Sequence, residues 1–175
     1  QIDLSHTLCD GLAVGKLGAA PFGIVKRVVD RVVTVDEASI ALAILRLIEL
    51  EKSVVEGAGA APLAAFLAGR LDALKGKQVV LALCGGNIDA SALGRIIEVG
   101  LVADGRLCRF TVTISDRPGG LATLLSVFAD GGADLIEVEH IREGLDLHVR
   151  ETGIHATFEV RGAEHAQRLL ESARA

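Results

Sequence analysis

The sequence is poor in cysteine and in aromatic residues, and it contains no Met, Trp or Tyr. Its three cysteines, Cys9, Cys84 and Cys108, are widely separated, so they form neither a zinc-binding pattern nor the disulfide framework of a secreted domain. This usage favours the reducing cytoplasm. Apolar runs of the roughly 20 residues that span a bilayer are also missing, so we expect a soluble protein without a membrane partner.

Clustered positive charge is missing as well. The net charge is −5, and no run of Lys and Arg is long enough to follow a phosphate backbone, which argues against nucleic-acid binding. The five histidines lack the spacing of metal ligands, so we expect no metal site. The chain starts with Gln and has no Met, so we expect it to be a piece of a longer protein.

Apolar residues, in contrast, make up half of the chain, enough for the core of one ordinary domain or of two small ones. From residue 31 to residue 101, patterns typical of strands and helices alternate, which predicts an α/β layer with a mostly parallel sheet. The predicted strands are 31–35, 54–55 and 79–83, and the predicted helices are 22–29, 37–51 and 60–68. Pro62 is expected in the first turn of the last of these helices.

The stretch 79–89 is the centre of this half of the chain. An apolar run with two valines ends abruptly in Cys84, Gly85, Gly86 and Asn87, the pattern of a buried strand that opens into a tight loop. Ligands of open α/β sheets bind beyond the carboxyl ends of the strands, where bare glycine backbone could approach a planar ligand closely. On the pattern alone, a strand followed by a glycine turn without a ligand is the favoured interpretation.

Glu56 is a single carboxylate between an apolar segment and a glycine-rich helix start. The simplest interpretation is a carboxylate that stabilises the positive end of the helix, an effect of about 0.3–1 kcal/mol. The alternative is a group that orders or polarises a ligand beside Cys84, in the crevice beyond the strand ends. On the sequence alone the first interpretation is favoured.

The second half of the chain has a different order of elements, strand, helix, strand, strand, helix (βαββα). The predicted strands are 107–114, 135–141 and 155–160, and the helices are 121–128 and 163–173. In the first strand, Cys108, Phe110, Val112 and Ile114 alternate with polar residues, so we expect them to face a core. A turn over 116–120 follows this strand.

Three segments in order, Thr7–Val14, Val54–Ala60 and Leu83–Asp89, resemble the threonine/serine dehydratases. These are pyridoxal-phosphate enzymes with the tryptophan-synthase-β type of fold (fold type II), and serine racemase is related to them. The tail from Phe110 to Ala173 resembles an ACT regulatory domain, an α+β ferredoxin-like unit, that lacks its last strand. The resemblance implies part of a catalytic domain over 1–103 and an ACT domain over 104–175.

The resemblance also implies roles for five residues at a pyridoxal 5′-phosphate site. Cys84 would face the pyridine nitrogen, Gly85 and Gly86 would let the backbone approach the ring, Glu56 would lie near the ring, and Gly11 would form part of the pocket wall. The Schiff-base lysine of the family lies upstream of the Thr7-like segment. None of the lysines in this sequence has a matching context, so we expect no catalytic residue and no covalent cofactor in this chain.

The implied activity is deamination of L-threonine or L-serine to a 2-oxo acid and ammonia. In ACT domains the loop after the first strand lines an amino-acid effector site, which here implies Asp116, Gly119 and Gly120; a simple capped turn is the equally weighted alternative. ACT domains pair, so we expect a homo-oligomer. Two other functions stay open: a separate amino-acid-sensing module, and a serine racemase, which the ACT-like tail disfavours.

Overall fold

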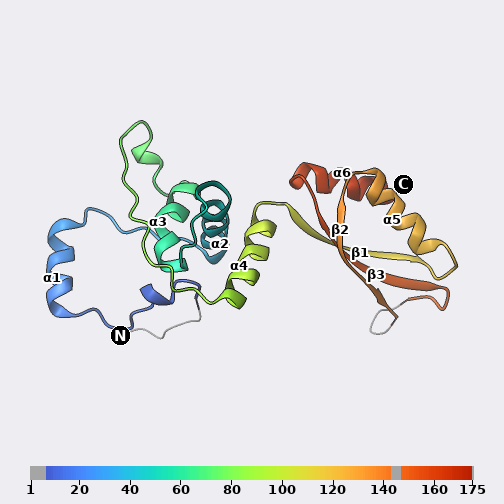
Figure 1. The fold of residues 1–175 in the computed structure, drawn as a ribbon, viewed down its shortest axis with the longest axis horizontal. Helices are drawn as coiled ribbons and strands as arrows, with labels where there is room; N and C mark the ends of the chain where they lie inside the picture. Colours follow the sequence, from blue (N-terminus) through green and yellow to red (C-terminus); the bar gives the residue numbers. More distant parts are fainter. Residues whose placement is uncertain (1–6, 143–146, 175) are drawn as a thin grey trace. The chain divides into compact units, whose positions relative to one another are not determined.

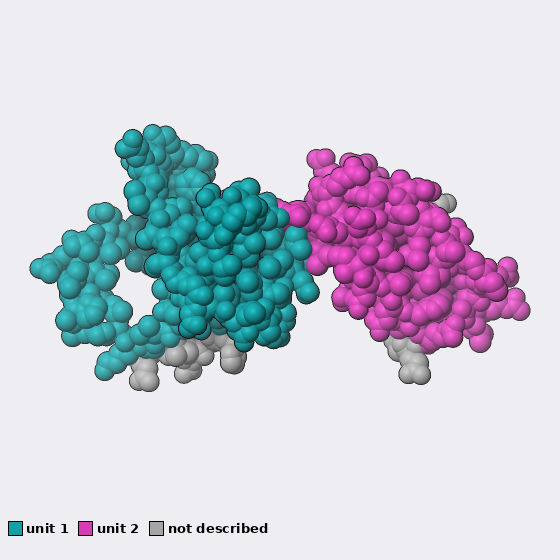
Figure 2. All heavy atoms as spheres, in the orientation of Figure 1, with its two compact units in different colours: residues 1–103 teal, residues 104–175 magenta. Residues whose placement is uncertain are grey.

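A computed structural model describes residues 7–142 and 147–174 of the chain. The chain folds as two compact units, Gln1–Ala103 and Asp104–Ala175, which Figure 2 displays in different colours. Each unit has its own hydrophobic core. Within the described residues, every helix is too short or too polar to cross a membrane.

The first unit consists of helices joined by long connecting segments (Figure 1). Its α-helices are α1 (Ala19–Val28), α2 (Glu37–Arg46), α3 (Gly57–Leu67) and α4 (Ala90–Ala103). Its short helical turns are η1 (Asp10–Leu12), η2 (Leu47–Glu51) and η3 (Asp72–Leu74). Helix α2 packs against both α3 and α4 and supplies most of the core, including Ile40, Ile44 and the adjoining Leu47.

The amphipathic period predicted for 37–51 forms as α2 followed directly by the π-helical turn η2. Asp36 begins α2, because its side chain accepts a hydrogen bond from the Ser39 amide at 2.7 Å. This bond favours the ionised carboxylate and lowers the pKa of Asp36. Lys52 ends η2 in the left-handed conformation, with φ of 53°.

The three strands predicted in this unit are wrong. Residues 31–35, 54–55 and 79–83 belong to neither a helix nor a strand. A strand is defined by a series of hydrogen bonds to a neighbouring strand. Among the described residues, a single backbone hydrogen bond connects the residues just after 54–55 and 79–83; it runs from Glu56 N to Gly85 O at 3.0 Å. Val80 is 94% exposed, so an apolar composition alone did not bury the segment.

The start of α3 also differs from the prediction. The helix begins at Gly57 instead of Ala60, and Pro62 therefore lies in its second turn. Because proline has no amide hydrogen, the carbonyl of Ala58 lacks its usual helical donor there.

The second unit has the predicted βαββα order, which the structure confirms. Its elements are β1 (Leu107–Ser115), α5 (Gly120–Asp130), β2 (Asp134–Ile141), β3 (Glu151–Glu159) and α6 (Ala163–Arg174). The three strands form an antiparallel sheet in the order β1-β3-β2. The mostly parallel sheet predicted for residues 31–101 is wrong, because the described residues of the first unit form no strand; the strands of the chain lie in this antiparallel sheet of the second unit.

The core of the second unit is built around three phenylalanines. Phe128 of α5 stacks on Phe158 of β3, with ring centroids 4.3 Å apart, and lies 5.0 Å from the ring of Phe110 on β1. Cys108, Val112 and Ile114 pack against the same cluster, so the alternation predicted for β1 is confirmed.

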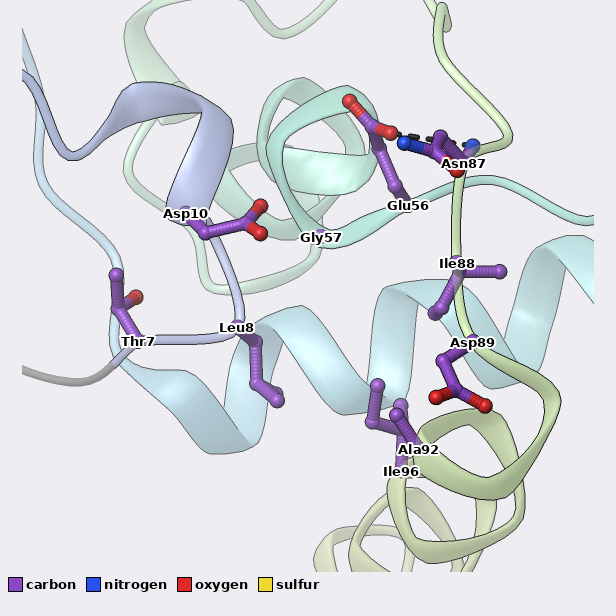
Figure 3. A pocket seen from close by; sticks show the side chains of 10 residues that line it. All are labelled: Thr7, Leu8, Asp10, Glu56, Gly57, Asn87, Ile88, Asp89, Ala92 and Ile96. Atoms are coloured by element: carbon purple, nitrogen blue, oxygen red, sulfur yellow. Dashed lines mark hydrogen bonds between the residues drawn. The ribbon is translucent and has the colours of Figure 1, made fainter.

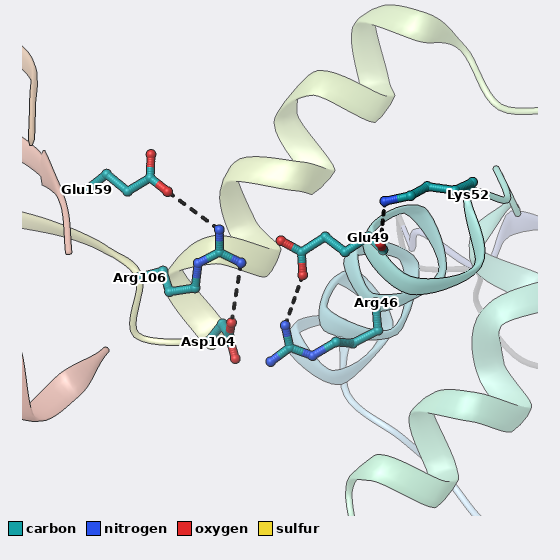
Figure 4. A network of polar contacts seen from close by, with 6 residues as sticks. All are labelled: Arg46, Glu49, Lys52, Asp104, Arg106 and Glu159. Atoms are coloured by element: carbon teal, nitrogen blue, oxygen red, sulfur yellow. Dashed lines mark hydrogen bonds and ion pairs between the residues drawn. The ribbon is translucent and has the colours of Figure 1, made fainter. Parts of the chain in front are cut away.

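Ion pairs support each unit separately (Figure 4). In the first, Arg46 of α2 pairs with Glu49 of η2 at 3.0 Å. In the second, Arg106 pairs with Asp104 at 3.8 Å and with Glu159 at 3.4 Å. The latter pair joins the residue before β1 to the last residue of β3, beside a backbone bond from Val160 N to Arg106 O.

Candidate functional site

A pocket of about 420 Å³ lies in the first unit, at the start of α3. Three separate parts of the chain and α4 form its walls, and Figure 3 shows the side chains around it. The lining residues are Thr7, Leu8, Asp10, Glu56, Gly57, Asn87, Ile88, Asp89, Ala92 and Ile96. The three segments that carry the family resemblance therefore meet at one place.

Glu37, at the start of α2, binds the segment 7–8, which forms one wall of the pocket. The Thr7 hydroxyl donates to Glu37 Oε1, and the Leu8 amide donates to Glu37 Oε2 at 2.8 Å. Burial raises the pKa of the next residue, Cys9, and the nearby carboxylate of Glu37 raises it further. Cys9 packs against the core of the unit as a small apolar residue.

Glu56 connects α3 to the loop after Cys84. It occupies the N-cap position of α3, but its side chain makes no capping hydrogen bond. Instead, Glu56 Oε2 accepts a hydrogen bond from the Asn87 amide at 3.2 Å, which Figure 3 marks, and its own amide donates to Gly85 O at 3.0 Å. Glu56 therefore holds the loop that contains the two glycines, and its N-cap position also keeps the residue at the positive end of α3.

Two of the predicted glycines, Gly85 and Gly11, lie near the Glu56 carboxylate. Gly85 has φ of +86°, and a β-carbon on it would lie 2.5 Å from Glu56 Oε1, so a larger residue would collide there. A β-carbon on Gly11 would lie 3.6 Å from the same oxygen and 3.2 Å from Ala58 Cβ. Gly11 and Gly85 thus both lie close to Glu56, whereas Gly11, Cys84, Gly85 and Gly86 are absent from the residues that line the pocket.

The pocket is strongly acidic. Asp10, Glu56 and Asp89 all line it. The pKa of Asp89 is lowered because its carboxylate accepts hydrogen bonds from the amide and the hydroxyl of Ser91. Such a pocket suits hydrogen-bond donors and positive charge better than a phosphate. In the part of the chain that the structure describes, no group of three or more His, Cys, Asp or Glu could hold a metal ion.

The chemistry around Cys84 fits one edge of a flat heteroaromatic cofactor. The Cys84 thiol is exposed and free, and the two residues after it have no side chains. A thiol can hydrogen-bond to a ring nitrogen without holding a charge-paired proton on it, as a carboxylate would. Lysine is missing from the residues that line the adjoining pocket.

In the second unit, the turn over 116–120 leads into α5. Gly119 is its N-cap residue with φ of +93°, and a β-carbon on Gly120 would lie 2.7 Å from Ser115 O. Asp116 Oδ1 accepts from Arg142 Nη2 at 3.3 Å, and the Asp116 amide donates to Arg150 O at 2.8 Å. The Asp116 side chain thus contacts Arg142, on the segment after β2.

Sequence reasoning missed several of the residues that shape the pocket. Asn87 and Asp89 were part of the central stretch, but no role was predicted for either, and the sequence explains Thr7 and Asp10 as well by turns as by contact with a ligand. Gly57 and Gly59 were treated only as part of a glycine-rich helix start. Two glycines two positions apart at the start of a helix are the signal that could have indicated close backbone contacts on both sides of that helix.

Comparison with known proteins places the chain among similar sequences. Residues 1–85 match the family described as pyridoxal-phosphate dependent enzyme. The chain is 43% identical over 170 residues to an L-threonine ammonia-lyase of Geobacter sulfurreducens, covering 97% of the chain and 42% of that protein. A Thermotoga maritima L-threonine ammonia-lyase is 42% identical over 169 residues, with the same two coverages.

A biosynthetic L-threonine dehydratase of Lactococcus lactis is 34% identical over 143 residues, which cover 81% of the chain and 34% of that protein. The chain therefore spans less than half of the length of these relatives. The family resemblance in the sequence is confirmed, and it implies the tryptophan-synthase-β-like fold for the catalytic part. Residues 1–85 belong to the pyridoxal-phosphate-dependent enzymes, and the chain corresponds to a portion of a threonine-dehydratase-like member of that family.

Proposed function

We propose that this chain is part of an enzyme that deaminates L-threonine, and L-serine, to 2-oxobutyrate or pyruvate and ammonia with pyridoxal phosphate. The proposal depends above all on one observation: the similarity to two L-threonine ammonia-lyases extends over 97% of the chain. The family match over residues 1–85 favours an enzyme over a sensing module in which the first unit is only a scaffold.

Pyridoxal phosphate, when bound, supplies an electron sink for loss of the substrate α-proton. In the proposed site the Cys84 thiol would face the pyridine nitrogen, and Gly85 and Gly86 would let the backbone approach the ring. The neutral thiol keeps the ring a weaker electron sink than a carboxylate would, which suits loss of a β-hydroxyl. Glu56 holds this loop through the Asn87 amide and contributes to the pocket wall with Gly11.

The second unit is proposed to be an ACT domain that binds a small amino acid and pairs with another copy in a homo-oligomer. Its βαββα order supports this role, as does the turn at Asp116, Gly119 and Gly120, which presents the start of α5. Arg142, which contacts Asp116, supplies a positive charge for a ligand carboxylate. The three free thiols support a location of the protein in the reducing cytoplasm.

Assays of the whole enzyme test the proposal. We expect 2-oxobutyrate from L-threonine and pyruvate from L-serine. Absence of both products would refute it. If a panel of amino acids then still raised the melting temperature, the chain would be a sensing module, and formation of D-serine from L-serine would indicate a racemase instead.

A further inference from the structure

Two buried glycines in the first turn of α3 contact two different segments of the chain. A β-carbon on Gly57 would lie 2.0 Å from Leu8 O, and one on Gly59 would lie 1.8 Å from Cys84 O and 2.8 Å from Val55 Cγ1. Carbon atoms do not approach carbonyl oxygens this closely, so neither position accepts a side chain unless its neighbour moves. Because glycine has no side chain, the backbone of each neighbouring segment can lie directly against the helix at these two positions.

The two contacts lie on opposite sides of the helix. Successive residues of an α-helix are rotated by about 100°, so positions two apart differ by about 200°. Gly57 faces the segment 7–10, which lines the pocket, and Gly59 faces the loop 84–87, which contains the Cys84 thiol. One helical turn thus separates the two segments.

Different hydrogen bonds accompany the two contacts. On the Gly59 side, the Glu56 amide donates to Gly85 O and the Asn87 amide donates to Glu56 Oε2. On the Gly57 side, the Leu8 amide donates to Glu37 and the Cys9 amide donates to the Thr7 hydroxyl. Each segment therefore has its own amide protons that report its position.

We infer that Gly59 is a positioning residue for the Cys84 loop and Gly57 a positioning residue for the segment 7–10, each acting on its own side of the site. The consequence for the cofactor depends on the proposed function: Gly59 would set the distance from the thiol to the ring, and Gly57 the shape of the facing pocket wall. The positioning itself depends only on contacts within this chain.

Hydrogen exchange of the backbone amides in the full 175-residue chain tests this inference. In Gly59→Ala we expect exchange at Glu56 and Asn87 to accelerate about tenfold, with Leu8 and Cys9 changed less than about twofold. In Gly57→Ala the pattern should be reversed. Gly94→Ala is the matched helical control, because nothing lies within 4 Å of its added β-carbon, and it should leave all four amides unchanged.

Equal acceleration of all four amides in both variants, or of none, would overturn the inference. The double variant Gly59→Ala/Val55→Ala removes the contact with Val55 and should keep the accelerated pattern; recovery of normal exchange would assign the effect to Val55 instead. If Gly59→Ala does not fold, Glu56→Ala adds no volume and should accelerate Asn87 without Leu8 or Cys9, and acceleration of all three would again contradict the inference.

The outcome is separable from that of the proposed function. If the whole enzyme has no deaminase activity, but each glycine variant accelerates exchange only at the amides on its own side of the helix, the proposed function is wrong and the positioning roles stand. An active enzyme without that pattern would reject the positioning roles alone.

Discussion

Replacement of Phe128 by Ala tests whether the second unit folds on its own core. Phe128 is fully buried, and its ring contacts both Phe158 and Phe110. The core of the first unit contains none of these residues. Phe128→Ala should therefore destabilise the second unit and leave the first unchanged.

The expected loss is large compared with the stability available. Truncation of a buried Phe to Ala costs about 3–5 kcal/mol. The complete burial of Phe128 and its two aromatic contacts, each worth about 0.5–1.5 kcal/mol beyond area, place it in the upper part of that range. A unit of this size has about 4–10 kcal/mol in total, so the variant should be only marginally folded.

The sequence has no Trp or Tyr for intrinsic fluorescence, and residue-resolved NMR during urea unfolding follows each unit separately. Amides of Ile154 report the second unit and those of Ile44 the first. Phe66→Ala, on the half-exposed face of α3, is the control and should change stability by less than about 1 kcal/mol. A loss below about 1 kcal/mol in Phe128→Ala, or an equal shift of both reporters, would refute the reasoning.

Three further predictions concern the first unit. Asp36→Ala should lower the melting temperature at neutral pH. Because the pKa of Asp36 is lower in the folded than in the unfolded chain, the difference in melting temperature between the variant and the original chain should disappear as the pH falls through the folded pKa. A difference that persists in acid would contradict the capping role. Glu37→Gln should lower the pKa of Cys9 and speed its alkylation at mildly alkaline pH, while Cys108, whose pKa is raised by burial alone, serves as the internal control. Borohydride treatment of the 175-residue chain with pyridoxal phosphate should leave no cofactor–lysine adduct in its mass spectrum, and a stable adduct would refute that expectation.

Local patterns were sufficient for the order of elements in the second unit, but not for the pairing of β1 with β3, which are not neighbours in the sequence. The alternation around Phe110 and the apolar stripe around Phe128 each predict an element that buries one face. In the first unit, the helical period of α2 and the cap at Asp36 were equally readable. These features depend on residues close together in the sequence.

The strands predicted for 31–35, 54–55 and 79–83 failed because strand formation depends on a hydrogen-bonded neighbour that composition does not specify. The gathering of Gly11, Glu56 and Gly85 was implied by the family resemblance, not by periodicity. The approach of Gly57 and Gly59 to distant carbonyl groups is a tertiary contact, which a glycine-rich helix start indicates only in general terms.

The central claim is that Cys84 contacts the pyridine ring in a threonine deaminase. Its most direct test is the kcat/KM of the whole enzyme for L-threonine in Cys84→Asp, with Cys108→Ser in the second unit as the control. Because a carboxylate would hold a proton on the ring nitrogen, we expect the aspartate variant to lose at least about tenfold in kcat/KM and to shift the absorption of the bound cofactor. Wild-type kcat/KM together with an unchanged cofactor spectrum would contradict the account.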